Sequence, residues 1–220
     1  MADAPDVFKA IDKNDRRRLK SILSKEPALA EAQNEQGISA ILYARYRSAD
    51  KAVEALLAAK PQLSIFEAAA VGDVKRIEEL LETNRSLVES YTPDGFTALH
   101  LASFFGQPEA ARVLLEHDAP INAVAANEMK VTPLHSAIAA NDAKISRLLI
   151  ENNADINVNQ ALGYTPLHEA AQNGNEEITR MLLENGADTK ARLEDGKTPA
   201  ELAKKHRHAN LAKVIIEFEQ

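Results

Sequence analysis

One tetrapeptide returns at a nearly constant interval, and this constrains the fold more than any other feature of the sequence. Thr-Pro-Leu-His occurs at residues 132–135 and again at 165–168. One interval earlier the same register reads Thr-Ala-Leu-His at 97–100, and one interval later it decays to Thr-Pro-Ala-Glu at 198–201. The four threonines are 35, 33 and 33 residues apart. Such a period predicts an array of repeated units, each stacked on its neighbours.

Each position of the motif suits the start of a helix. Threonine is a good N-cap because its hydroxyl accepts a hydrogen bond from a free backbone N–H group, and proline in the first turn loses no hydrogen bond. About twenty residues later each unit has an aliphatic pair such as Leu148-Leu149, and then a turn, clearest at Asn185-Gly186. Glycine there suits the positive φ of a C-cap. Each unit is therefore predicted to be a helix, a tight turn, a second helix and an extended finger.

The period and the tetrapeptide together resemble the ankyrin repeat, and the small cysteine-free chain resembles the short ankyrin-repeat proteins of bacteria. The resemblance implies an all-α solenoid of about seven helix-turn-helix units with short β-hairpin fingers. It also implies a surface that binds another protein. Three units with the motif span roughly 94–127, 128–160 and 161–194, and residues 195–220 are expected to form a C-terminal cap.

The N-terminal part lacks the motif but repeats itself at an offset of 58 residues. Of the 57 pairs from Val7 to Leu63, 13 are identical, and they fall at expected core and turn positions. We interpret 5–63 and 63–121 as two copies of a two-unit block. Ser64 and Glu67 have the spacing of a capping box, so the third unit is predicted to start its own helix.

The spacing of equivalent alanines is irregular at one junction. Ala10 to Ala44 is 34 residues, but Ala44 to Ala68 is only 24, so about ten residues are missing between the second and third units. Pro61 also prevents simple continuation of the helix there. We expect no finger at residues 58–63, two degenerate units in 1–62 and five units in 63–220. One continuous solenoid is favoured over a hinge between two modules.

Composition narrows the class of function. There is no cysteine, which excludes disulfides and thiolate sites, and no apolar run is long enough to span a membrane. No signal segment follows Met1, so a cytoplasmic protein is expected. The net charge of −7 argues against nucleic acid as the partner. The basic run at residues 16–18 is interpreted as the solvated outer face of a terminal helix.

No constellation of residues supports an enzyme. His168-Glu169 resembles the start of a zinc-protease helix, but Gln172 stands where the second histidine ligand would be. Gly196-Lys197-Thr198 resembles the end of a phosphate-binding loop, but Ala191 replaces the first glycine. We therefore predict no catalytic residue, no cofactor and no metal site. The motif histidines are expected to bond backbone groups of neighbouring turns.

The resemblance implies a concave groove formed by the finger tips and the exposed side of each first helix. Transferred by register, the candidate partner-binding residues are Tyr46, Arg47, Val71, Asp94, Phe96, Phe104, Phe105, Met129, Val131, Leu162, Tyr164, Gln172 and Asn173. Five of the ten aromatic residues of the chain lie at these positions. Aromatic residues and arginine are frequent hot spots of protein interfaces, and a large exposed apolar patch usually marks an interaction site.

The sequence therefore predicts a protein that binds another protein through an aromatic-lined groove. Two alternatives stay open at this point. Phe96 and Phe104 could instead pack on adjacent fingers and only stiffen them. The chain could also associate with itself through the groove or the irregular junction, although a monomer is favoured over a homo-oligomer.

Overall fold

The computed structural model describes residues 3–59 and 61–218. Within these residues the chain forms fourteen α-helices and three short 3₁₀ helices. The α-helices are α1 (Ala4–Asp12), α2 (Arg16–Leu23), α3 (Ala40–Tyr46), α4 (Asp50–Leu57), α5 (Ile65–Val71), α6 (Val74–Thr83), α7 (Ala98–Phe104), α8 (Pro108–Glu116), α9 (Pro133–Ala139), α10 (Ala143–Glu151), α11 (Pro166–Asn173), α12 (Glu176–Glu184), α13 (Pro199–Lys205) and α14 (Ala209–Glu217). The predicted all-α class is confirmed.

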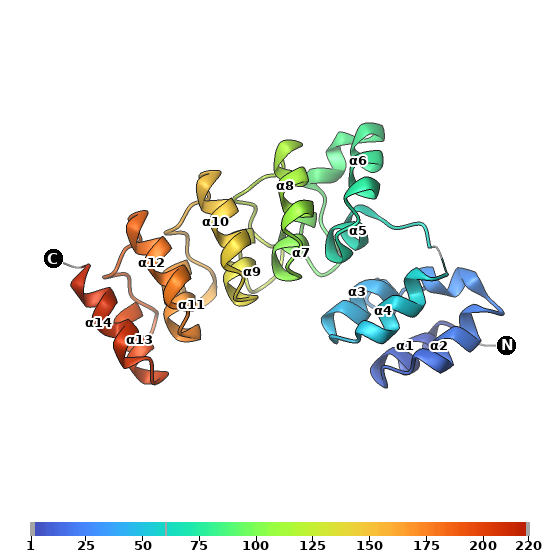
Figure 1. Cartoon of the computed structure of the whole chain (residues 1–220), viewed down its shortest axis with the longest axis horizontal. Coiled ribbons are helices and arrows are strands. Elements are labelled where there is room, and N and C mark those ends of the chain that lie inside the picture. The colour runs from blue at the N-terminus through green and yellow to red at the C-terminus, as the bar shows by residue number, and fades with distance from the viewer. Residues whose placement is uncertain (1–2, 60, 219–220) are drawn as a thin grey trace.

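The helices pair in chain order, and the pairs stack into an elongated array (Figure 1). First helices pack on first helices, as α5 does on α7, α7 on α9, and α11 on α13. Second helices do the same along the other side, as α6 does on α8 and α10 on α12. Small buried residues such as Ala102, Ala137 and Ala170 let the first helices approach closely. The hydrophobic core therefore runs along the array, because each pair packs mainly on its neighbours.

The repeated tetrapeptide starts the first helix of a pair, as predicted. The hydroxyls of Thr97, Thr165 and Thr198 accept hydrogen bonds of 3.3–3.4 Å from the backbone N–H three residues later. The side chain at that third position accepts in return from the threonine N–H, so both bonds of a capping box are present. In α7 and α11 this returning group is the motif histidine, through its Nδ1 atom. The histidine is thus part of the helix start.

The self-similarity at an offset of 58 residues is seen in the structure, except that α1 and α5 begin at different register positions. Helix α3 begins and ends 58 residues before α7. The 3₁₀ helices Pro27–Glu31 and Arg85–Glu89 are related by the same offset. Gly37 and Gly95, also 58 residues apart, have positive φ angles of 77° and 89°. The first two pairs therefore repeat the structure of the next two without the threonine tetrapeptide.

The fingers are tight turns, and the predicted β-hairpins are not seen in the described residues. The nearest to a strand there is one isolated bridge, between Gln33 and Ser39. The finger before α7 is closed by a 2.8 Å bond from the Thr92 N–H to the Phe96 carbonyl. Successive fingers are joined by single backbone bonds, such as the one from the Ala126 N–H to the Gly95 carbonyl (2.8 Å). One bond per neighbour is too few to make a strand ladder.

The junction between the second and third pairs differs from the others. Helix α3 packs on α5, but α4 and α6 make little contact, and α1–α4 are turned relative to the later pairs (Figure 1). Residues 61–64 form an extended link without a finger, and Lys60 lies outside the described residues. Hydrogen bonds hold this link on both sides, from the Gln62 N–H to the Glu31 carboxylate (2.8 Å) and from Arg76 Nε to the Leu63 carbonyl (3.0 Å). The first helices thus stack through the junction, whereas the second helices do not.

Candidate binding groove

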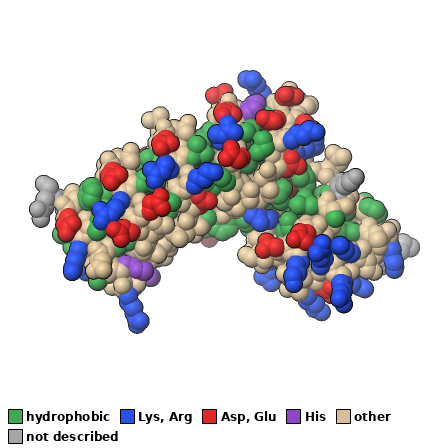
Figure 2. Space-filling model, viewed as in Figure 1, with side chains coloured by type: hydrophobic (Ala, Val, Ile, Leu, Met, Phe, Trp, Pro, Cys, Tyr) green, Lys and Arg blue, Asp and Glu red, His purple; other side chains and the backbone are tan. Residues whose placement is uncertain are grey.

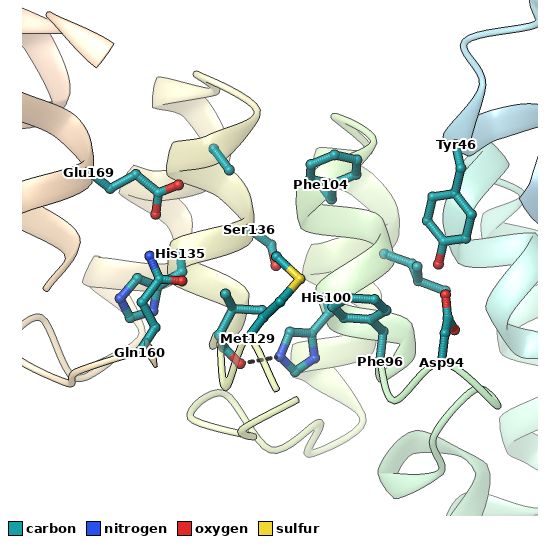
Figure 3. A pocket seen from close by; sticks show the side chains of 13 residues that line it. Tyr46, Asp94, Phe96, His100, Phe104, Met129, His135, Ser136, Gln160 and Glu169 are labelled. Carbon is teal, nitrogen blue, oxygen red and sulfur yellow. Dashed lines mark hydrogen bonds between the residues drawn. The ribbon is translucent and has the colours of Figure 1, made fainter. Parts of the chain in front are cut away.

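A cavity of about 440 Å³ opens where the fingers meet the first helices in the middle of the array (Figure 3). It is bordered by side chains from four helices and three fingers: Tyr46, Asp94, Phe96, His100, Leu101, Phe104, Met129, Val131, His135, Ser136, Ala139, Gln160 and Glu169. We call this cavity the groove. It extends from the end of α3, across α7 and α9, to the first turn of α11.

Helical spacing explains which residues reach the groove. In α7, Leu101 and Phe104 are three residues apart, and in α9 the same holds for Ser136 and Ala139. Residues at this spacing lie on one face of a helix. The fingers complete the lining from the other side, because each one precedes its first helix and folds back over that face.

Three large apolar side chains form the middle of the groove. Phe104 is 45% exposed and Met129 is 55% exposed, while Phe96 is half-buried. In Figure 3, Met129 lies centrally between Phe96 and Phe104 on one side and the polar residues of α9 and α11 on the other. Exposed apolar groups that line one concavity are typical of a binding surface.

Tyr46 and Asp94 close the N-terminal end of the groove. Burial, reinforced by the neighbouring Asp94 carboxylate, raises the pKa of the Tyr46 hydroxyl well above its usual value, so Tyr46 stays neutral. The Tyr46 ring packs on Phe105 at a centroid distance of 5.5 Å. Arg45 also packs on Phe105, with its guanidinium carbon 4.6 Å from the centre of the ring. Its Nη2 atom donates a hydrogen bond to the Phe105 carbonyl at 3.1 Å. The second pair is thereby held to the end of α7.

The two histidines in the groove have different bonding. His100 Nε2 bonds the Val131 carbonyl at 3.0 Å, and the equivalent atom of His168, outside the groove, bonds the Lys197 carbonyl at 3.1 Å. His135 Nε2 is buried and makes no short hydrogen bond among the described residues, but the carbonyl of Tyr164, which corresponds in register to those of Val131 and Lys197, acts as the backbone partner of this ring. The prediction that the motif histidines bond neighbouring backbone is therefore confirmed for His100 and His168, and the bond of His135 is the weakest of the three.

Burial keeps the groove histidines neutral. It lowers the pKa of both His100 and His135 to about 4, against an ordinary value of 6.5. The Thr132 N–H donates to His135 Nδ1 at 3.3 Å, so the ring proton is on Nε2. This tautomer is the one that donates to the Tyr164 carbonyl, which partly offsets the lowering of the His135 pKa.

Glu169 supplies an unused acceptor at the same end of the groove. Its Oε2 atom is buried and has no hydrogen-bond partner among the described residues. Burial raises the pKa of this carboxyl group to about 7. Figure 3 shows the carboxylate directed from α11 towards the groove, on the same side as His135 and Gln160.

The structure brings together six of the thirteen residues predicted from the sequence. Tyr46, Asp94, Phe96, Phe104, Met129 and Val131 all line the groove. Val131, however, is only 6% exposed and lies at the bottom of the groove. Its carbonyl is hydrogen-bonded to His100 Nε2.

Arg47, Val71 and Phe105 lie elsewhere. Arg47 bonds Asp12 at 3.2 Å and so faces α1. Val71 borders a second cavity at the junction, beside Leu57 and Pro61. Phe105 is half-buried between Tyr46 and Arg45, so the expectation that it faces solvent is wrong.

The predicted residues nearer the C-terminus also lie outside the groove. Leu162 is 61% exposed at a finger tip. The Tyr164 hydroxyl donates to the Gln172 amide oxygen at 3.1 Å, so these two side chains partner each other. Asn173 Nδ2 donates to the Ile138 carbonyl at 3.2 Å and ties α11 to α9.

Sequence reasoning missed the polar residues of the groove, above all His135, Gln160 and Glu169. One signal was available for Glu169. Its register position in α11 corresponds to Leu101 in α7 and Leu202 in α13, so a carboxylate there departs from these two units that also carry the threonine motif. Gln160 had no such signal, because the finger that carries it has a conformation of its own.

The outer surface is mixed in charge. Figure 2 shows acidic and basic side chains interspersed along the later pairs and a concentration of Lys and Arg on the N-terminal pairs. Residues 16–18 are exposed, and Arg16 bonds Glu54 at 3.2 Å. Across the described residues, no helix is long and apolar enough to cross a membrane. In the same part of the chain, no three His, Asp or Glu side chains are grouped so that they could hold a metal ion.

Comparison with known proteins agrees with the repeat architecture. The family model described as ankyrin repeats in three copies matches residues 65–160 and 147–220, which is α5 to α14. Neurogenic locus notch homolog protein 1 of Xenopus tropicalis and that of Xenopus laevis are each 43% identical to this chain over 60 residues. That stretch is 27% of this chain and 2% of either relative. Since the family model covers well over half of the residues, the chain belongs to the ankyrin-repeat family.

Proposed function

We propose that the protein is a non-catalytic binding module that takes a segment of another protein into the groove. The observation that carries the proposal is the exposure of Phe104 and Met129 within one concavity. Ankyrin-repeat arrays generally mediate protein–protein interaction, and the repeat fold places this concavity on rigid helices. A cytoplasmic location and the assignment of the first two pairs as ankyrin-like units belong to the same proposal.

The size of the groove favours an extended segment or a short helix as its occupant. The groove is elongated, because the described residues that line it belong to successive units, from Tyr46 in α3 to Glu169 in α11. A groove of this kind suits a peptide that buries one or two apolar anchors. Truncation of an anchor contact typically weakens binding by more than about 1 kcal/mol.

The test is selection of peptides from a random phage-displayed library on the full chain, followed by affinity measurement with a selected synthetic peptide. Phe104→Ala and Met129→Ala should each weaken binding at least about fivefold. Phe218→Ala is the matched control, because Phe218 is also 45% exposed but lies at the end of α14, outside the groove. Equal affinity of the wild type and both groove variants would contradict the proposal.

Methionine methyl NMR locates the bound peptide independently. Met129 lines the groove, whereas Met181, on the buried face of α12, is only 5% exposed. Peptide addition should shift the Met129 methyl resonance and leave that of Met181 unchanged. Light scattering on the free chain tests the alternative occupant, a second copy of the same protein, which would appear as a dimer that Phe104→Ala dissociates.

A further inference from the structure

Glu169 differs from its counterparts in the other helices that begin with the threonine motif. These are Leu101 in α7, Ser136 in α9 and Leu202 in α13, none of which carries a charge. In α5 the same register position, counted from Ala68, is Glu67, whose carboxylate is used by the Ser64 cap. Leu101 and Leu202 are nearly fully buried at this position. Burial costs the Glu169 carboxyl group its hydration, a cost that leucine does not have. Its Oε2 atom receives no hydrogen bond from any described residue to offset this cost. The array itself therefore does not account for this residue.

The open group at this end of the groove is an acceptor. Glu169 borders the groove, and its Oε2 atom has no donor among the described residues. An acceptor left open in a cavity indicates a ligand that donates a hydrogen bond to it.

The charges of the groove favour a cation. Asp94 and Glu169 are the acidic residues among those that line it, and the described lining includes no lysine or arginine. The guanidinium groups of Arg45 and Arg47 are bonded elsewhere, that of Arg45 to the Phe105 carbonyl and that of Arg47 to the Asp12 carboxylate. Opposite charge across an interface gives orientation and specificity.

We propose that the groove recognises a partner segment in which a lysine or arginine lies beside an apolar side chain. The basic side chain donates to Glu169, and the apolar side chain packs among Phe96, Phe104 and Met129. This inference rests on the proposed function and specifies the chemistry of the partner. Binding a cation also favours the ionised form of Glu169, which burial alone disfavours.

The experiment uses a peptide selected on the wild-type chain and synthesised in two forms. One form carries arginine or lysine as selected, and the other carries citrulline or norleucine, which remove the charge and keep the length. The wild type should bind the charged form at least about tenfold more tightly. Glu169→Gln should bind both forms with equal affinity. Glu184→Gln is the matched control, because it removes an exposed carboxylate at the end of α12, outside the groove, and it should keep the preference.

The outcomes separate this inference from the proposed function. If selected peptides depend on Phe104 but contain no basic residue, or if Glu169→Gln keeps the preference, the basic anchor is wrong and the groove remains a binding site. The same holds if Glu184→Gln abolishes the preference. If no peptide depends on Phe104, both proposals fail. Glu169→Leu repeats the test with the residue that α7 has at this position, in case the glutamine variant folds poorly.

Discussion

At the level of single residues, the three motif histidines show how one residue type serves two purposes in successive units. All three lie at the third position of their helices and cap the preceding threonine. His100 and His168 also bond the next finger, so both ring nitrogens are used. His135 keeps its capping role, and its backbone partner across the turn is the Tyr164 carbonyl. The motif histidine thus ties each helix start to the next finger.

Glu169→Gln should stabilise the protein in a pH-dependent manner. The folded-state pKa is about 7 and the ordinary value is 4.5, so ionisation of Glu169 opposes folding. Its cost is absent below about pH 4, grows as the pH rises from 4.5 to 7, and is constant above that. The difference corresponds to roughly 3 kcal/mol, so the variant should gain 2–3 kcal/mol at pH 8 and nothing at pH 4. Urea unfolding of both proteins across this range measures the gain, and an equal gain at both ends would refute the assignment.

Phe104→Ala and Leu149→Ala should differ sharply in their effect on stability. Leu149 is fully buried in α10, so its truncation leaves a cavity and should cost about 2–5 kcal/mol. The neighbouring Leu148 is only half-buried and is the less informative site. Because Phe104 is 45% exposed, Phe104→Ala should lower the free energy of unfolding by less than about 1 kcal/mol. If thermal unfolding shows equal losses, Phe104 belongs to the core and the groove assignment is wrong.

At the level of elements, helix starts are encoded locally. Helix α5 lacks the threonine tetrapeptide, yet Ser64 and Glu67 form both bonds of a capping box, as predicted from their spacing. Glu67 is buried, and its carboxylate accepts from both the Ser64 N–H and the Ser64 hydroxyl at 2.8 Å. The third pair therefore has its own start signal directly after the irregular link.

Ser64→Ala should destabilise the chain by about 1 kcal/mol, because the α5 N-terminus loses a cap and Glu67 loses a donor. Ser21→Ala is a suitable control, since Ser21 is an exposed residue within α2 and alanine is the better helix former there. Chemical unfolding of both variants measures the difference. A loss for Ser64→Ala no larger than that of the control would show that the cap contributes little.

At the level of the whole molecule, the junction after α4 is where neighbouring pairs share the least surface. The stack continues through α3 and α5 and through the contact of Tyr46 and Arg45 with Phe105, but α4 and α6 make little contact. Because repeat arrays are stabilised by interfaces between neighbours, a reduced interface means weaker coupling. The first two pairs also supply Tyr46, so their position affects the groove.

Residues 63–220 are predicted to fold cooperatively alone, whereas 1–62 alone should be marginal at that length. Limited proteolysis of the full chain should cut first between Ala58 and Leu63. Hydrogen exchange should show α1–α4 opening at lower free energy than α7–α12. Uniform protection across residues 6–200, without a preferred cut near Pro61, would mean that the array has no weak point there.

The sequence by itself determined what depends on local or periodic information. The spacing of Thr97, Thr132, Thr165 and Thr198 indicated the repeat. The offset of 58 residues aligned the sequence of α3 with that of α7. The sequence also indicated the apolar part of the groove, since Phe96, Phe104 and Met129 follow from register alone. These features are readable because helix capping and helix periodicity involve residues only a few positions apart.

Tertiary structure decided the rest. It placed Arg47 against Asp12 and Arg45 over Phe105, and it left Glu169 Oε2 without a partner in the groove. Whether a polar group is satisfied depends on atoms far away in sequence, such as the carbonyls of the next finger. The chemistry of the groove thus arises from contacts between units, while the units themselves are encoded one at a time.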